Sequence, residues 1–189
     1  MINAGNYEVQ VIRSRRKTLS VSIRDGALVV SAPLRTSDQT INDFLYKHRR
    51  WIQVHMEKAQ ASHMEAESAG RLTMEEIRDL ADQALKVIPE RVKHYAALMG
   101  VTYGRITIRN QRTRWGSCTA QGNLNFNCLL MLCPLEVIDS VIVHELAHRR
   151  EMNHSPRFYA LVRKAYPEYD KWNQWLKDNG PVLMKRMTG

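Results

Sequence analysis

The chain has 189 residues, of which 44% are hydrophobic and 25% charged, a balance that excludes an intrinsically disordered protein and suits one domain with a small appendage. It has no apolar run of about 18 residues and no signal-peptide pattern at MINAGNYEVQ, so neither a membrane protein nor a secreted one is expected. The net charge of +9 favours anionic partners, nucleic acid included, without naming one. Three cysteines without CxxC spacing predict reduced thiols and a cytoplasmic location: Cys118, Cys128 and Cys133.

The N-terminal third predicts an antiparallel sheet followed by a helix. Strands are expected over 7–13, 17–24 and 27–33, and Asp25-Gly26 is a strong hairpin signal between the last two. A helix should follow near 38–59, with Thr36 or Ser37 as its cap. The next segment lacks apolar periodicity and contains Gly70. The predicted division is an N-terminal subdomain over 1–60, a linker over 61–72, a second domain over 73–180 and a tail over 181–189.

The second domain is predicted to combine helices with a small antiparallel sheet, which makes the fold class α+β. A capping-box pattern from Thr73 to Glu76 opens a helix that should run to about Met99, with a kink or break at Pro89. Short strands are expected within 104–110, 113–119 and 122–128. Further helices are expected from Pro134 to about 150, near 156–165 and near 168–178.

The helix expected over 135–150 carries ionisable residues on a buried surface. At about 100° per residue, His144 and His148 lie one turn apart on the same face, with Glu145 beside them. Buried ionisable groups are costly unless they share a counter-charge. Two histidines at this spacing can bind zinc, and the glutamate between them can act as a general base, as in H-E-x-x-H zinc hydrolases. The alternative is a core helix with two neutral, hydrogen-bonded histidines, which leaves Glu145 unexplained.

A catalytic zinc site needs a third protein ligand, and His154 is the best candidate. It lies six residues after His148 and directly before Ser155-Pro156, a pattern that opens a new helix. The chain must therefore bend at His154. We expect this bend to bring the imidazole over the first two histidines.

The sequence resembles the YgjP-like metallohydrolases, which are related to the SprT-like and WLM zincin peptidases. The resemblance covers most of the chain, and the segments that carry it are TRWGSC (113–118), GNLNFN (122–127), residues 138–162 and PEYDKW (167–172). It implies zinc held by His144, His148 and His154, with Glu145 as the base. It also implies a zincin-like layout with a small sheet over the active-site helix. Most relatives carry a predicted peptidase label, and some have been described as a nucleotide pyrophosphatase acting on UTP.

Three functions fit these features. The first is a metallopeptidase, in which an extended peptide pairs with strand 122–128 as a sheet edge and Asn125 contacts the substrate. The second is a nucleoside triphosphate pyrophosphatase with arginines that bind phosphates, although no Gly-rich phosphate loop is present. The third is a nucleic-acid-associated protein whose zinc is structural, with Cys118 as a possible fourth ligand. A variant of the first is a protease that acts on nucleic-acid-bound proteins.

Candidate residues for contacting the substrate lie in or next to the segments that carry the resemblance. Tyr159 and Arg114 are candidates to stabilise an oxyanion, and Arg112 and Arg114 to bind substrate. Each has a simpler interpretation, since a buried tyrosine commonly just fills space and most arginines are solvated surface charges. The sequence does not predict the oligomeric state.

Overall fold

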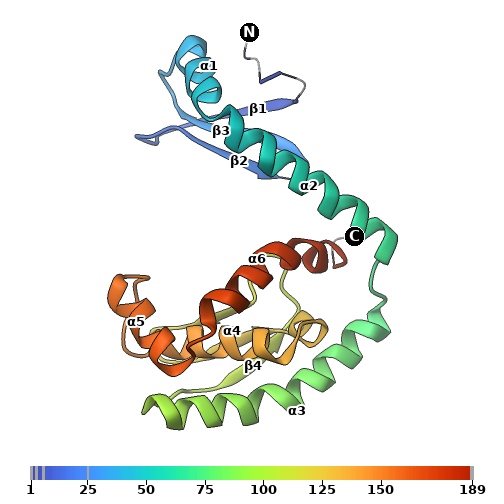
Figure 1. The fold of residues 1–189 in the computed structure, drawn as a ribbon, viewed down its shortest axis with the longest axis vertical. Helices are drawn as coiled ribbons and strands as arrows, with labels where there is room; N and C mark the ends of the chain where they lie inside the picture. Colours follow the sequence, from blue (N-terminus) through green and yellow to red (C-terminus); the bar gives the residue numbers. More distant parts are fainter. Residues whose placement is uncertain (1, 3, 6, 25, 188–189) are drawn as a thin grey trace. The chain divides into compact units, whose positions relative to one another are not determined.

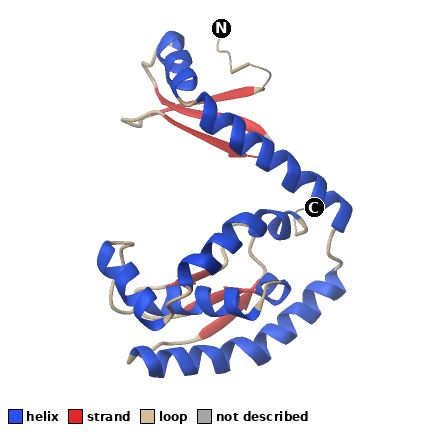
Figure 2. Cartoon of the chain, viewed as in Figure 1, coloured by secondary structure: helices blue, strands red, loops and turns tan. Residues whose placement is uncertain are grey.

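The computed structural model describes residues 2, 4–5, 7–24 and 26–187. The chain forms two compact units, Met1–Ser68 and Ala69–Gly189, each with its own small sheet and helices (Figure 1). The fold is therefore α+β, as predicted, and helix is the more abundant structure in both units (Figure 2). Among the described residues, none of the helices combines the length and apolar character needed to cross a membrane.

The N-terminal sheet is mixed rather than antiparallel. Strand β3 (Ala27–Pro33) lies in the centre, antiparallel to β2 (Ser20–Arg24) and parallel to β1 (Val9–Ser14). Gly26, in the predicted hairpin turn, has a φ of 79°, while Asp25 lies outside the described residues. The expected antiparallel sheet was wrong because alternation along a strand marks its buried face but does not identify its neighbour.

The helical region of this unit differs from the prediction at two points. The helix expected over 38–59 is two helices, α1 (Asp38–Lys47) and α2 (Arg49–Ala69), separated at His48, whose φ is −99° and ψ 10°. The linker expected over 61–72 is helical as far as Ala69. The residues from 61 to 69, ASHMEAESA, are mostly good helix formers, so the segment is helical without an apolar stripe.

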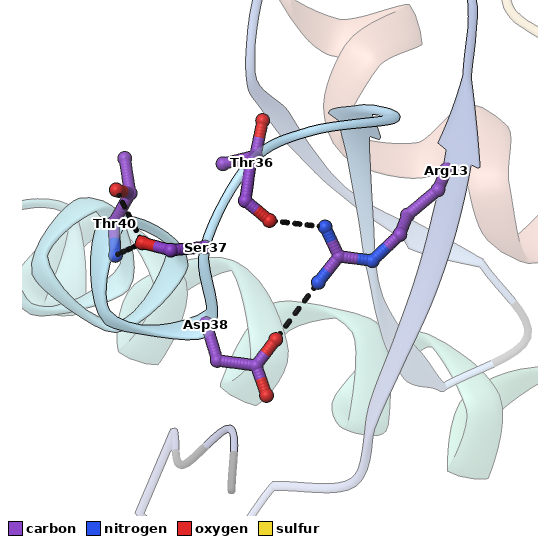
Figure 3. Close-up of polar contacts among 5 residues, drawn as sticks. All are labelled: Arg13, Thr36, Ser37, Asp38 and Thr40. Carbon is purple, nitrogen blue, oxygen red and sulfur yellow. Dashed lines mark hydrogen bonds and ion pairs between the residues drawn. The ribbon is translucent and has the colours of Figure 1, made fainter.

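Arg13 ties the sheet to the start of α1 (Figure 3). Its guanidinium donates to the backbone oxygen of Thr36 and, at 2.8 Å, to Oδ1 of Asp38. Of the two predicted caps, Thr36 and Ser37, Ser37 is the one that caps the helix, and its Oγ accepts from the backbone N of Thr40 at 3.1 Å. Both Arg13 and Asp38 are partly exposed, so the pair contributes less than about 1 kcal/mol. One charge of the basic run 13–17 thus has a structural role.

The sheet of the second unit is also mixed. Strand β6 (Leu124–Asn127) is central, parallel to β4 (Ile106–Arg109) and antiparallel to β5 (Gly116–Cys118). The expectation that strand 122–128 is a free edge was therefore wrong, because β6 has a partner on each side. Strands β4 and β5 form the edges of this sheet.

The helices of the second unit begin close to the predicted positions. Helix α3 (Met74–Met99) has the predicted capping box between Thr73 and Glu76, and it continues through Pro89 instead of breaking there. The short 3₁₀ helix η1 (Cys128–Leu132) precedes α4 (Leu135–Ala147), and α5 (Pro156–Ala165) follows. Helix α6 (Tyr169–Lys185) occupies most of the segment that was expected to be a tail.

Helix α4 is the central element of the unit, in contact with α3, α5, α6 and β5. Most of its residues are buried, including Asp139, which is 4% exposed. The carboxylate of Asp139 accepts hydrogen bonds from the guanidinium of Arg91 and, at 3.0 Å, from the hydroxyl of Tyr95, both on α3. This buried polar cluster fixes the helix that carries the H-E-x-x-H motif.

Candidate metal centre and active site

The structure brings His144, His148 and His154 together. His144 is in the last turn of α4, His148 caps the end of that helix, and His154 lies in the loop before α5. One ring nitrogen from each residue lies within 4.8 Å of those of the other two. The Nε2 atoms of His144 and His154 are 2.9 Å apart. The bend predicted at His154 therefore places its imidazole next to the first two rings.

The outward-facing ring nitrogens of the two helical histidines have protein partners. Nδ1 of His148 lies 3.2 Å from the backbone oxygen of Glu151. Because a carbonyl can only accept, this Nδ1 carries the proton and Nε2 keeps a free lone pair. Nδ1 of His144 lies 2.9 Å from the hydroxyl of Tyr169, the first residue of α6. Such outer contacts orient the histidine ligands of protein metal sites.

Phe158 forms an aromatic surface against which all three imidazoles pack. The centroid of its ring lies 4.8, 4.6 and 4.8 Å from those of His144, His148 and His154. Phe158 is fully buried in α5. The cap of this helix at Ser155, one residue after His154, positions both Phe158 and the third histidine. A rigid apolar surface of this kind limits rotation of the three rings.

Burial favours the neutral form of the two helical imidazoles, His144 and His148. Burial, together with the smaller effect of charge on His148 and His154, lowers the pKa of His144 to about 4. Burial likewise lowers the pKa of His148. Neutral imidazole is the form that binds a metal ion. The neutral rings of His144 and His148 therefore suit a cation site, because burial disfavours their protonated forms.

Glu145 lies beside the cluster and is 6% exposed. Burial raises its pKa to about 8, although the charge of Arg114 acts in the opposite direction. Its carboxylate packs against the backbone of Gly116 in β5, where an added Cβ would lie 2.8 Å from both Cγ and Oε1 of Glu145. A glycine at 116 is therefore required for this carboxyl position. A buried acid with a raised pKa beside a cation site is typical of a general base.

Three adjoining hollows cross the site and together form a feature that we call the groove. The histidine hollow, about 320 Å³, adjoins the three imidazoles, and the central hollow, about 260 Å³, extends from Glu145 toward α6. The far hollow, about 340 Å³, continues along α6. The first two hollows share four residues: Arg114, Gly116, His144 and Glu145. The last two share Thr113, Trp115, Asn173 and Leu176.

The predicted substrate residues lie at different distances from the histidines. Arg114 lines both hollows next to Glu145, whereas Arg112 lines the far hollow. Asn125 is on the central strand, where its amide donates to Ser117 Oγ and accepts from Arg109, and it lines none of these hollows. Tyr159 lies beside His154, with ring centroids 6.2 Å apart, and is likewise outside the groove.

Sequence reasoning missed two aromatic residues that contact the histidines, Phe158 and Tyr169. Both lie in segments that carry the family resemblance, so those segments contained the signal. To predict the roles of these two residues, one must know how α5 and α6 pack on α4. The same limit applies to Gly116, which the sequence marks only as a glycine within a strand.

Comparison with known proteins agrees with this geometry. A family model described as YgjP-like, metallopeptidase domain, matches residues 17–78 and 74–179. The chain belongs to the YgjP-like family. The family is one of metallopeptidase-like hydrolases, and the three histidines are a group among the described residues that can hold a metal ion. No curated protein matched the chain.

Two solved structures are similar to part of this YgjP-like chain. One is the metallopeptidase zymogen jannalysin of Methanocaldococcus jannaschii, 20% identical, with a TM-score of 0.43. The other is the metallopeptidase zymogen abylysin of Pyrococcus abyssi, 18% identical, with a TM-score of 0.44. Each alignment covers 48% of this chain and 93% of the other.

Proposed function

We propose that the protein is a zinc-dependent metallopeptidase whose site is formed by His144, His148 and His154 with Glu145 as the general base. The observation that carries the proposal is the convergence of three imidazoles beside a buried carboxyl group. Three nitrogen ligands that leave a position open are typical of catalytic zinc sites. A bound zinc ion would supply a Lewis acid and lower the pKa of water toward about 7.

Glu145 is placed to move a proton in this reaction. Its carboxyl lines the same hollow as the histidines, so it can take a proton from water there and return it to the leaving amine. Without a nearby cation, burial favours the protonated acid. A positive charge held by the adjacent histidines would favour the carboxylate that a base requires. The raised pKa of Glu145 and the histidine cluster therefore support the same function.

Arg114 is the better candidate for the group that stabilises developing negative charge. It lines both hollows that meet at Glu145, and its charge reaches that carboxyl. Tyr159 lines neither hollow. We therefore assign the oxyanion role to Arg114 and a packing role to Tyr159.

The free edge of β5 offers a place for a peptide backbone. Thr119 N donates to Asn123 O, and Asn127 N donates to Trp115 O, both at 2.9 Å. Hydrogen-bonded residues alternate along an antiparallel pair, so the N–H and C=O groups of Gly116 and Cys118 point away from β6. Both residues line the histidine hollow. An extended peptide could thus pair with β5 and pass beside Glu145.

A single assay tests this function. Zinc-loaded protein is incubated with a mixture of peptides and, separately, with nucleoside triphosphates, and products are identified by mass spectrometry. We expect peptide cleavage that depends on zinc and that falls by at least about 10³-fold in Glu145→Gln, because removal of the base leaves water unactivated. The variant should still bind zinc, since the histidines are intact.

Pyrophosphate release that requires Glu145, without peptide cleavage, would contradict the proposal and support a nucleotide substrate. The nucleoside triphosphate arm of the assay is needed because arginines lie near the site, and arginine also binds phosphate well. Cleavage that persists in Glu145→Gln would indicate a contaminating peptidase.

A further inference from the structure

The groove has two walls that come from different parts of the second unit. One wall is formed along its whole length by residues 112–118, which end in β5. The opposite wall passes from α4 to α6. On α6 the groove residues follow a helical stripe that begins where Tyr169 contacts His144: Tyr169, Asn173, Leu176, Lys177, Gly180 and Met184.

The far hollow is cationic, with one positive side chain on each wall. Arg112 comes from the segment before β5 and Lys177 from α6. Both are exposed, and within the described residues neither forms an ion pair. The charge of Lys177 acts on Asp170, whose carboxylate is already held by Arg163 at 2.7 Å. Of the residues that the structure describes, none that lines the far hollow carries a carboxylate.

Most of the other residues that line the far hollow are apolar. The indole of Trp115 lies against Gly180, where an added Cβ would be 3.1 Å from Cζ2 of the ring. Leu176 and Met184 line the same hollow. Positive side chains from both walls of a mostly apolar hollow match an acidic group carried on an otherwise uncharged peptide segment.

The spacing along α6 fixes where that acidic group would lie. Tyr169 marks the metal end, and Lys177 follows eight residues later, roughly 12 Å along a helix that rises about 1.5 Å per residue. An extended peptide advances about 3.3 Å per residue. The cationic position is thus roughly three to four substrate residues from the cut bond.

We propose that the far hollow is a specificity site that selects peptides with a carboxylate three or four residues from the scissile bond. The inference rests on the proposed peptidase function and adds the substrate class to it. The carboxylate is either an Asp or Glu side chain or the C-terminus of the peptide. Arg112 and Lys177 are the residues that determine the preference.

A scan of labelled peptides tests the proposal. In a neutral ten-residue peptide with both ends blocked, one Asp, Asn or Lys is moved through every position. Dissociation constants are measured by fluorescence anisotropy with zinc-loaded Glu145→Gln, and kcat/KM and the cut position with the wild-type protein. We expect Asp at one position to improve both values about 3- to 10-fold over Asn, and Lys to weaken them. A second series with free C-termini separates a terminal carboxylate from a side chain.

Charge reversal shows whether the two cations are responsible. In Arg112→Glu/Lys177→Glu the preference should change from Asp to Lys at the same position. The control is Lys86→Glu/Lys93→Glu, which changes the net charge equally at two exposed positions on α3. The control should keep the wild-type preference, because a charge effect over the whole molecule is not position-dependent.

The outcomes separate this inference from the proposed function. Cleavage without a positional Asp preference, or with one that survives the double reversal, overturns the inference and leaves the peptidase intact. Position-dependent binding of acidic peptides without cleavage supports the cationic site and overturns the peptidase. A nucleoside triphosphate that binds through Arg112 and Lys177, while acidic peptides do not, overturns both.

Discussion

The hydroxyl of Tyr169 lies 2.9 Å from Nδ1 of His144, a residue 25 positions earlier in the chain. This contact joins α6 to the H-E-x-x-H helix and orients the His144 ring so that its Nε2 faces His154. Tyr169 is 3% exposed, so water does not replace it readily. The contact gives the buried hydroxyl of Tyr169 a hydrogen-bond partner.

Tyr169→Phe should weaken zinc binding about 10- to 100-fold. The substitution keeps the ring and removes the hydrogen-bond partner of His144, and loss of such outer partners typically has an effect of this size. Zinc affinity is measured by competition with a chromophoric chelator. Tyr159→Phe is the control, and its affinity should stay within about twofold of wild type. Equal affinities for the two variants would show that the contact does not position His144.

Gly116→Ala should reduce turnover while leaving zinc affinity nearly unchanged. The new Cβ would lie 2.8 Å from Glu145, so the carboxyl or the strand must move. A displacement of about 1 Å at a catalytic group can lower the rate about 10²-fold. We expect kcat to fall toward that of Glu145→Gln, measured in the same peptide assay. Turnover equal to wild type would place Glu145 outside the reaction.

Glu145→Gln should stabilise the metal-free protein at high pH. The pKa of Glu145 is raised from 4.5 to about 8 by burial, so the folded state binds more protons than the unfolded state between those values. Its stability contribution therefore falls as pH rises through that window. Thermal or urea unfolding in the presence of a chelator should show a small difference between variant and wild type at pH 5.

At pH 9 the Glu145→Gln variant should be more stable by about 2 to 4 kcal/mol, because a buried charge is no longer formed. Glu90→Gln, an exposed change on α3, is the control and should show no pH-dependent gain. A gain that is equal at pH 5 and pH 9 would mean that the carboxyl is not buried as described.

Arg91→Met should destabilise the second unit by about 3 kcal/mol. It leaves the buried Asp139 carboxylate with the Tyr95 hydroxyl as its remaining partner among the contacts described above. Adding Asp139→Asn should recover part of that loss, because the uncompensated charge is removed. Urea unfolding measures both. A double variant less stable than Arg91→Met would indicate that Asp139 matters for packing rather than charge.

Local sequence spacing predicted the parts of this protein that depend on neighbours within a turn or two. The capping box at Thr73, the helix start at Ser155-Pro156 and the shared face of His144 and His148 all follow from helix geometry over a few residues. These predictions were confirmed because the interactions involved are local. The position of His154 also followed, since the bend before α5 leaves few other paths for the chain.

Tertiary structure decided which distant segments meet. It placed β3 and β6 at the centres of mixed sheets, which gives β5 a free edge that the sequence assigned to strand 122–128. It also brought Tyr169, Phe158 and Gly116 to the histidines and the acid that they contact. Strand alternation and helix periodicity describe the faces of single elements, whereas pairing between elements depends on packing and loop closure over long separations, which no local pattern encodes.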